Sequence, residues 1–223
     1  MSLGEPREHH ETIGSTNERA RELAEEGAAH GALVTADEQT SGRGRQGRSW
    51  ATPPGVAIAA SLILREFDDL LPLRAGLAVA DIAGPSALVK WPNDVWVDGK
   101  KVAGILVEAR EGWAVLGIGV NVAVDVSALP PDAAAVAGTL GRDESEVEAT
   151  LTELLDALET RLEQEKAAAL TSLRERDALL GKSVRWDGGE GLGAGIDDSG
   201  ALLVHQPDGT TTALSAGEVT LTT

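Results

Sequence analysis

The stretch Val95-Trp96-Val97-Asp98-Gly99-Lys100-Lys101-Val102-Ala103-Gly104-Ile105-Leu106-Val107 sets an Asp-Gly pair between two apolar, β-prone segments. An Asp-Gly pair in that position is a strong signal for a β-hairpin. Further strands are predicted on either side of it, at residues 8–13, 33–36, 56–64, 87–89 and 113–122. Between two of these strands, the apolar residues over 73–82 recur at helical spacing, which predicts a helix there. Strands joined by both hairpins and crossovers predict a mixed β-sheet that carries helices, an α+β fold.

Two more helices are predicted from their end signals. Ser15 with Glu18 forms a capping box, so a helix should begin there and end at Gly27. Residues 143–146 (Asp-Glu-Ser-Glu) cap another helix, because apolar residues recur every three or four positions over residues 147–162. These helices should pack their apolar faces against the sheet.

The chain changes character after Gly181. A further helix should run to Leu180 and end at Gly181, and short β segments separated by glycine-rich turns follow it. The predicted strands are residues 183–186, 191–196, 201–206 and 211–214. Short strands at close spacing predict a small barrel-like β domain. We therefore expect two domains, residues 1–180 and residues 181–223.

The composition narrows the class of protein. The chain has 223 residues, no cysteine and a formal net charge of -17. Without cysteine, disulfides and thiolate chemistry are excluded. The acidic excess should repel nucleic acid, and the scattered acids favour a heavily solvated surface over a site for basic partners. No signal-peptide pattern and no bilayer-length apolar segment occur, so we expect a cytoplasmic protein without a membrane partner.

The motif Gly42-Arg43-Gly44-Arg45-Gln46-Gly47-Arg48-Ser49-Trp50 reverses the sign of the charge locally. Glycine allows close backbone approach and the arginine fork matches phosphate or carboxylate, so this loop is equipped to bind an anion. Its Gly-x-Gly-x-x-Gly spacing is not a dinucleotide fingerprint, because no strand directly precedes it and no helix follows. Kinase and Walker motifs are also missing from the sequence. A surface turn that forms salt bridges with nearby acids is the alternative.

Companion motifs decide between these interpretations. They are Ser15-Thr16-Asn17, Gln39, Lys90-Trp91-Pro92-Asn93-Asp94, Lys101-Val102-Ala103-Gly104 and Gly119-Val120-Asn121-Val122. In this order and spacing, together with the arginine loop (residues 42–50), they resemble the biotin protein ligases along nearly the whole chain. Only about fourteen residues precede Ser15, too few for the helix-turn-helix domain of the family's repressors. The resemblance is therefore to the ligase-only form.

The resemblance implies a fold and an activity. The implied fold is a catalytic domain like those of class II aminoacyl-tRNA synthetases and biotin-lipoate ligases, followed by a small SH3-like β-barrel domain. Such enzymes join biotin to AMP using ATP and Mg²⁺, and then pass biotin to a lysine of a biotin carboxyl carrier protein. We expect no nucleic-acid partner, and a homodimer is possible. Protein ligands for a metal are not expected, since Mg²⁺ arrives with ATP.

The resemblance also implies roles for individual residues. Lys101 and Arg45 are the expected catalytic residues, because two anions meet in the first step and cations offset their repulsion. The residues expected to bind biotin are Ser15, Thr16, Asn17, Gln39, Arg43, Gly44, Arg45, Lys101 and Gly104. Those expected to bind ATP or the adenylate are Arg43, Arg45, Arg48, Trp50, Lys90, Asn93, Asp94 and Asn121. Trp91 is expected to fill the core, and residues 40–50 are expected to become ordered when ligand binds.

Several of these residues have structural alternatives. Ser15 could serve only as a helix cap, Asn121 could end a strand, and Asn93 with Asp94 could form a turn. The two histidines at residues 9–10 are expected in packing or solvent-facing roles rather than at a metal. The rival activities are lipoate ligation by the same two-step chemistry and a non-enzymatic protein that senses biotin.

Overall fold

The computed structural model describes residues 3–50 and 53–222 of the chain. Its larger sheet has seven strands in the order β1-β2-β3-β7-β6-β5-β4. They are β1 (Arg7–Ile13), β2 (Leu33–Gln39), β3 (Ala57–Leu64), β4 (Leu88–Lys90), β5 (Asp94–Val97), β6 (Lys100–Arg110) and β7 (Trp113–Asn121). The pair β1 and β2 runs parallel and the other neighbouring pairs run antiparallel. The predicted mixed sheet is confirmed.

The Asp-Gly hairpin forms as predicted. Asp98 and Gly99 have φ angles of +50° and +76°, which let the chain reverse within two residues. The reversal pairs β5 with β6 and sets Asp94 opposite Gly104. On its other side, β6 pairs with β7 and Gly104 lies opposite Gly119. The hairpin therefore aligns three of the motif-bearing strands side by side.

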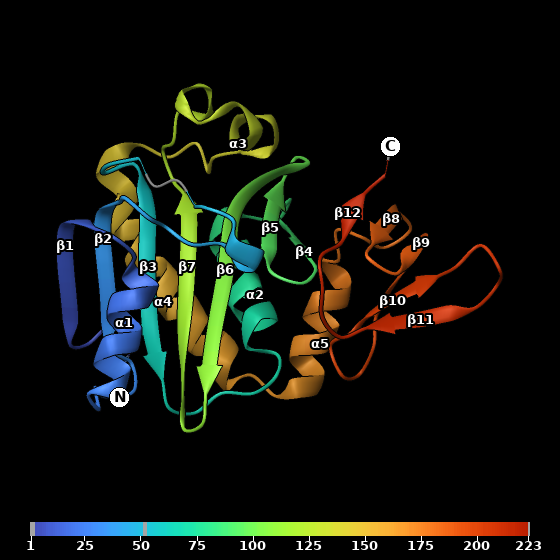
Figure 1. The fold of residues 1–223 in the computed structure, drawn as a ribbon, viewed down its shortest axis with the longest axis horizontal. Helices are drawn as coiled ribbons and strands as arrows, with labels where there is room; N and C mark the ends of the chain where they lie inside the picture. The colour runs from blue at the N-terminus through green and yellow to red at the C-terminus, as the bar shows by residue number, and fades with distance from the viewer. Residues whose placement is uncertain (1–2, 51–52, 223) are drawn as a thin grey trace.

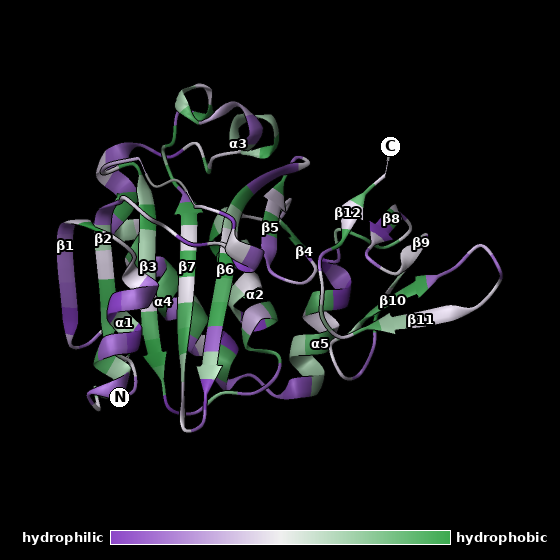
Figure 2. Cartoon of the chain, viewed as in Figure 1, coloured by the Kyte–Doolittle hydropathy of each residue, from purple (hydrophilic) through white to green (hydrophobic). Residues whose placement is uncertain are grey.

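Helices cover both faces of this sheet (Figure 1). The α-helices of the described residues are α1 (Thr16–Glu25), α2 (Leu71–Ala83), α3 (Pro131–Val136), α4 (Val147–Glu163) and α5 (Lys166–Glu175). α2 and α4 pack behind the sheet around the larger apolar core, which includes Leu77, Leu116 and Leu154. α1 lies on the opposite face, where Ala20 and Ile63 belong to a smaller cluster. The central strands β3, β6 and β7 are largely apolar, whereas the edge strand β1 is hydrophilic (Figure 2).

The first helix begins where the sequence predicts, but not by the predicted contact. Ser15 occupies the N-cap position of α1, yet its side chain makes no capping hydrogen bond, so the capping box is wrong. Glu18 instead pairs with Arg43 at 3.4 Å and with Arg21 at 3.8 Å. The helix ends before Gly27, which has φ +93° as a C-terminal glycine should. The cap predicted before α4 does form, as a capping box between the side chains and backbone of residues 143 and 146.

The last of the four predicted helices is too long. α5 ends at Glu175, not at Leu180. The backbone that follows pairs with the edge strand β4 instead: Val89 N donates to Arg176 O at 2.8 Å, and Ala178 N donates to Val89 O at 3.1 Å. An edge strand has unpaired N–H and C=O groups. Here the chain forms hydrogen bonds with these groups, and the helix ends before them.

The C-terminal residues form a second, antiparallel sheet in the order β11-β10-β9-β8-β12. Its strands are β8 (Ser183–Trp186), β9 (Gly189–Ile196), β10 (Leu202–His205), β11 (Thr211–Leu214) and β12 (Thr220–Leu221). The four predicted strands are confirmed and β12 is additional. The expected closed barrel is corrected: in the described part of the chain, β11 and β12 are the two edges of an open sheet. β12 pairs through two residues with β8 alone, which is too short to close it.

The second sheet is joined to the first at the segment between β4 and β5. Trp91 Nε1 donates to Gly200 O at 3.1 Å, and Lys90 Nζ donates to Val219 O at 2.7 Å. Trp91 is buried in the larger core, as predicted. Across residues 3–50 and 53–222, the structure contains no helix with the length and apolar character needed to cross a membrane.

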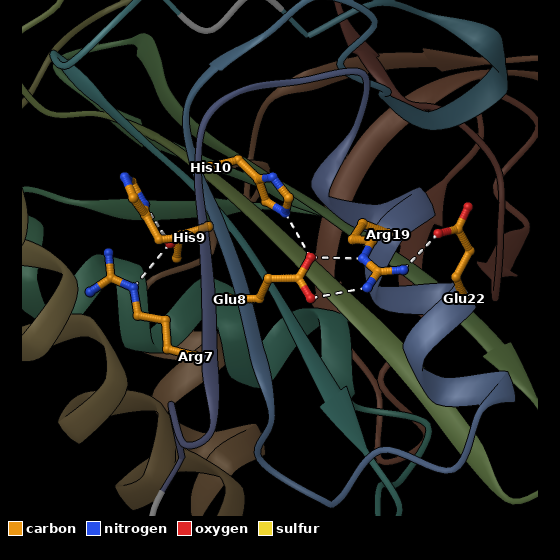
Figure 3. A network of polar contacts seen from close by, with 7 residues as sticks. Arg7, Glu8, His9, His10, Arg19 and Glu22 are labelled. Atoms are coloured by element: carbon orange, nitrogen blue, oxygen red, sulfur yellow. Dashed lines mark hydrogen bonds and ion pairs between the residues drawn. The ribbon is translucent and has the colours of Figure 1, made fainter.

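Charged pairs line β1, the open edge of the larger sheet (Figure 3). Glu8 accepts a hydrogen bond from Arg19 Nε at 2.7 Å, which lowers the pKa of the Glu8 carboxyl. His10 Nε2 lies 2.7 Å from Glu8 Oε1, and His9 Nδ1 lies 3.0 Å from Thr35 Oγ1. The histidines thus join contacts between β1 and its neighbours. Among the described residues, no group of three or more His, Asp or Glu side chains could hold a metal ion.

Candidate active site

A cavity of about 570 Å³ opens on the α1 face of the larger sheet. Its walls come from the start of α1, the arginine loop, strands β3, β6 and β7, and residues 129–137. The predicted site residues that line it are Ser15, Thr16, Asn17, Gln39, Arg43, Gly44, Arg45, Arg48, Trp50, Asn93, Lys101, Gly104 and Asn121. In Figure 1 the arginine loop crosses in front of β7 and β6, below α3. Motifs far apart in the sequence therefore meet in one cavity.

Neutral polar groups line part of this cavity. Gln39, at the end of β2, accepts the backbone N–H of Thr16 through Oε1 at 2.8 Å, which fixes the first turn of α1 against the sheet. Ser15 is 3% exposed, and its Oγ is buried without a hydrogen-bond partner among the described residues. A buried polar group left unpaired costs about 1–3 kcal/mol. Ser15 Oγ is therefore placed to bond with a polar group of a ligand.

The arginine loop folds into a turn held by its own backbone. Trp50 N donates to Gly42 O at 2.8 Å, and Gly44 N donates to Arg48 O at 2.7 Å. A side chain at Gly42 would overlap the carbonyl oxygen of Trp50. Glycine at this position thus lets the two ends of the loop meet.

The indole of Trp50 lies against glycines of β6 and β7. A Cβ added at Gly119 would lie 2.5 Å from Trp50 Cε2, and one added at Gly104 would lie 3.0 Å from Cζ3. Because Gly104 and Gly119 are opposite each other in the sheet, they form a trough that accepts the ring. Trp50 Nε1 is buried there and has no hydrogen-bond partner within residues 3–50 and 53–222. Lys101 Nζ lies 5.4 Å from the ring centre, within range of a cation-π interaction.

Four cations line the cavity of this acidic protein. Lys101 Nζ pairs with Asp94 Oδ1 at 2.7 Å. Arg45 donates to Asn93 Oδ1 and to Gly217 O, each at 3.1 Å, which ties the arginine loop to both sheets. These contacts hold Lys101 and Arg45 in defined positions. A concentration of fixed positive charge attracts anionic ligands.

The other two cations, Arg43 and Arg48, form exposed ion pairs. Arg43 lies 3.4 Å from Glu18, and Arg48 lies 2.6 Å from Glu218. Exposed pairs of this kind stabilise by about 1 kcal/mol or less. Both guanidinium groups can therefore turn toward an anionic ligand at small cost.

Two predicted site residues lie outside the lining that the described residues form. Lys90 is buried beside the second sheet, where its Nζ donates to Val219 O at 2.7 Å, and this burial lowers the pKa of Lys90. Asp94 reaches the cavity only through its ion pair with Lys101. Lys90 therefore lies outside the lining although it is opposite Asp94 in the β4–β5 pair, whereas Asp94 can act through Lys101.

The two asparagines combine structural contacts with a place in the lining. Asn93 Nδ2 donates to Ile105 O at 2.8 Å, and Asn121 Nδ2 donates to Gly138 O at 2.8 Å. Each amide is thereby anchored on a neighbouring segment while its residue faces the cavity. The structural alternative and the ligand-binding expectation are compatible at both positions.

Residues 10–125 match the Biotin/lipoate A/B protein ligase family, and residues 180–221 match the Biotin protein ligase C terminal domain. The chain belongs to this family. A biotin--[acetyl-CoA-carboxylase] ligase of Mycobacterium tuberculosis is 35% identical over 92% of this chain and 85% of its own length. One from Paracoccus denitrificans is 36% identical over 87% of this chain and 92% of its own. A structure of the biotin protein ligase of Aquifex aeolicus in complex with biotin and ATP aligns with a TM-score of 0.85 at 28% identity, covering 98% of this chain and 99% of that one.

Membership of the biotin/lipoate ligase family confirms the resemblance drawn from the motifs. Motif reasoning missed one wall of the cavity, which is formed by Leu129, Pro130, Asp132, Ala133, Val136 and Ala137. This segment reads as an ordinary proline- and alanine-rich loop, although Pro131 at the first position of α3 is a usual helix start. Two residues that contact Asn17 were also missed: Ser61 Oγ lies 2.7 Å from Asn17 Oδ1, and Glu108 accepts a hydrogen bond from Asn17 Nδ2 at 2.9 Å. The single hydroxyl of Ser61 within the apolar strand β3 was the available signal.

Proposed function

We propose that this chain is an ATP-dependent biotin protein ligase. It activates the carboxylate of biotin with ATP to give biotinyl-5′-AMP, and transfers the biotinyl group to a lysine of a biotin carboxyl carrier protein. One observation carries the proposal: a single cavity presents the polar groups of Ser15, Thr16 and Gln39 together with the cations of Arg45 and Lys101. Biotin has a neutral ureido ring and a carboxylate, so it needs both kinds of partner.

In the first step, a carboxylate oxygen of biotin attacks the α-phosphorus of ATP, a C–O–P linkage forms and pyrophosphate leaves. Two anions approach each other, so the step requires fixed positive charge rather than a protein nucleophile. In this proposal Lys101 and the arginines at 43, 45 and 48 supply the charge. Asp94 orients the Lys101 ammonium through their 2.7 Å ion pair. Mg²⁺ is proposed to enter on the phosphates of ATP and to neutralise part of their charge.

The ureido ring is proposed to bind where neutral polar groups gather. Ser15 Oγ, which has no hydrogen-bond partner in the described part of the chain, bonds with a polar group of the ring. Thr16, Asn17 and Gln39 complete this end of the site. A site that pairs every polar group of its ligand rejects analogues that lack one of them, because the site's own buried group is then left unpaired.

In the second step, the amine of the acceptor lysine attacks the acyl carbon of the adenylate, an amide forms and AMP leaves. The adenylate must be kept from water until the acceptor arrives. The arginine loop is suited to this task, because Trp50 covers the trough formed by Gly104 and Gly119 and Arg45 bonds with Asn93. We propose that residues 40–50 close over the ligand in this way.

Exchange of pyrophosphate into ATP tests the proposal against its rivals. The protein is incubated with ATP, Mg²⁺ and labelled pyrophosphate, and biotin or lipoate is added in turn. Exchange that depends on biotin supports the ligase. Exchange that depends on lipoate would indicate a lipoate ligase, and biotin binding without exchange would indicate a biotin-sensing protein. A carrier domain, with its acceptor lysine intact or replaced by arginine, then tests the transfer step.

The organisation of the enzyme is also proposed. Residues 1–180 form the catalytic domain and residues 181–223 form a C-terminal domain, which is supported by the change of sheet after α5 and by the family match over residues 180–221. The enzyme is proposed to work in the cytoplasm, where it draws on ATP. Light scattering of the purified protein distinguishes a monomer from a homodimer.

A further inference from the structure

A short segment of the second sheet, residues 217–219, lies against cations that come from the first part of the chain. In Figure 1 this segment leads into β12 beside the connection from β4 to β5. Gly217 O accepts a hydrogen bond from Arg45 Nη2 at 3.1 Å, and Val219 O accepts one from Lys90 Nζ at 2.7 Å. Arg45 lines the cavity, whereas Lys90 is buried outside its lining. We call residues 217–219 the C-terminal strap.

Lys90 places a positive charge in a buried position. Its side chain is 8% exposed, and besides the contact with Val219 O its Nζ lies 5.5 Å from the centre of the Trp96 ring. Burial of a charge is costly, and an apolar side chain of similar length would avoid that cost. A contribution to stability is therefore a poor explanation for this lysine. A firm hold on Val219 O is a better one, because a hydrogen bond from an ion is roughly twice as strong as a neutral one.

The hold on Val219 O also restricts Gly217 O. The two carbonyls are separated by rigid peptide planes and only a few rotatable bonds, so fixing one limits the positions of the other. Gly217 O bonds with one arm of the Arg45 guanidinium, and Asn93 Oδ1 bonds with the other arm at 3.1 Å. Both contacts of Arg45 thus begin at residues 90–93, one directly and one through the C-terminal strap.

The second sheet has another attachment, which does not involve the strap. Trp91 Nε1 donates to Gly200 O at 3.1 Å. Gly200 also packs so closely on α2 that a side chain there would lie 2.4 Å from Leu70 Cδ2. Loss of the bond from Lys90 should therefore free the strap while the sheet stays attached.

We propose that Lys90 is a positioning residue that acts on Arg45 through the C-terminal strap and thereby keeps the arginine loop over the cavity. The action on the loop is independent of the ligand, whereas its consequence for the adenylate rests on the proposed function. Lys90 thus contributes to the site without touching the ligand.

Hydrogen exchange on the ligand-free full chain measures how often the arginine loop opens. Gly44 N and Trp50 N donate to carbonyl groups within the loop, so these amides exchange when the loop opens. Lys90→Met removes the ammonium and keeps most of the side-chain length. It should raise the exchange rate over residues 42–50 about tenfold, since one hydrogen bond from a charged group is lost. Exchange in the central strand β3 should keep the wild-type rate.

Gly217→Ala tests the same link from the other end. Gly217 has a φ angle of +114°, which alanine rarely adopts, and a Cβ added there meets nothing within 4 Å. The backbone should therefore turn without any new packing contact, Gly217 O should leave Arg45, and exchange of the loop should rise as in Lys90→Met. Lys182→Met is the matched control, because it makes the same change at an exposed position next to β8. It should keep the wild-type exchange rates.

Release of preformed adenylate tests the consequence for the site. Lys90→Met should release the adenylate about tenfold faster than the wild type. Arg45→Gly should release it faster as well, and the double variant should release it no faster than Arg45→Gly alone. Two residues that act through one contact are not additive, whereas a general loss of stability would add to the effect of Arg45→Gly.

The outcomes separate the inference from the proposed function. Exchange over residues 42–50 that stays at the wild-type rate in both Lys90→Met and Gly217→Ala, or that rises equally in β3, would overturn the inference. Additive effects of Lys90→Met and Arg45→Gly on adenylate release would also overturn it. Wild-type protein that forms no adenylate from biotin would overturn the proposed function, and hydrogen exchange would still decide the link from Lys90 to the loop. Faster exchange that is confined to the loop in both variants supports the inference.

Discussion

Gly119→Ala probes the trough beneath Trp50 most directly. The added Cβ would lie 2.5 Å from Trp50 Cε2 and 2.6 Å from Nε1, well inside van der Waals contact. β7 is paired on both sides within the sheet, so the indole must move rather than the strand. A tryptophan buries at least ~150 Å². If the displaced indole loses half of this contact area, the loss at ~25 cal/mol/Å² corresponds to about 2 kcal/mol of binding free energy. If Trp50 covers the adenylate, the variant should therefore release it about thirty-fold faster.

The assay preforms the adenylate from labelled biotin and ATP, adds excess unlabelled biotin, and follows the loss of bound label. The free energy of urea unfolding of Gly119→Ala should differ from that of the wild type by less than about 1 kcal/mol, because a side chain on a loop moves and the core does not. Gly14→Ala is the matched control, since a Cβ added there meets nothing within 4 Å. If Gly119→Ala retains the adenylate as long as the wild type and the control do, Trp50 does not cover it and the reasoning is wrong.

Arg45→Gly removes the two hydrogen bonds that tether the arginine loop, so it should release adenylate that biotinylates unrelated lysines; tight retention of the adenylate by this variant would contradict the prediction. Lys101→Gln should lower kcat for pyrophosphate exchange by about 10²–10³-fold while biotin binding by calorimetry weakens less, and an unchanged kcat would remove Lys101 from the chemistry. Glu8→Gln should lower the free energy of unfolding by ~0.5 kcal/mol at neutral pH. Because Arg19 lowers the pKa of Glu8, that stabilisation is present above the ordinary value of 4.5 and is lost as pH falls through the lowered pKa. Urea titrations of wild type and Glu8→Gln should therefore converge in acid, and a constant difference would exclude this ion pair as its cause.

The sequence predicted those elements whose limits depend on their own residues. The hairpin at Asp98-Gly99 and the end of α1 before Gly27 need only backbone conformations that these residues favour. Predictions failed where a distant segment decides. The end of α5 depends on hydrogen bonds to Val89 of β4, and closure of the C-terminal barrel depends on how many residues β12 can pair. Local patterns contain no information on either partner.

The candidate site could be predicted to a similar extent, and for the same reason. A motif that combines charged residues with glycines, such as the arginine loop, indicates a binding site, because few structural roles require that combination. The apolar wall over residues 129–137 has no such composition. Glu108 looks like any exposed strand residue in the sequence, and only the fold brings it to 2.9 Å from Asn17. Residues such as Glu108, which contact a motif without belonging to one, have no signal of their own in the sequence.

At Ser15 the sequence and the structure disagree. The sequence predicts that its side chain caps α1, and the structure shows no such capping hydrogen bond. A serine that caps a helix stabilises the protein by about 0.5–2 kcal/mol. Among the residues that the structure describes, Ser15 Oγ makes no such bond and is buried without a partner, as is Trp50 Nε1 in the same cavity. Ser15→Ala should therefore leave the free energy of urea unfolding unchanged or slightly higher, while biotin binding by calorimetry weakens about tenfold, since one hydrogen bond to the ligand is lost. A loss of more than about 1 kcal/mol of stability with unchanged biotin affinity would instead assign Ser15 to the helix.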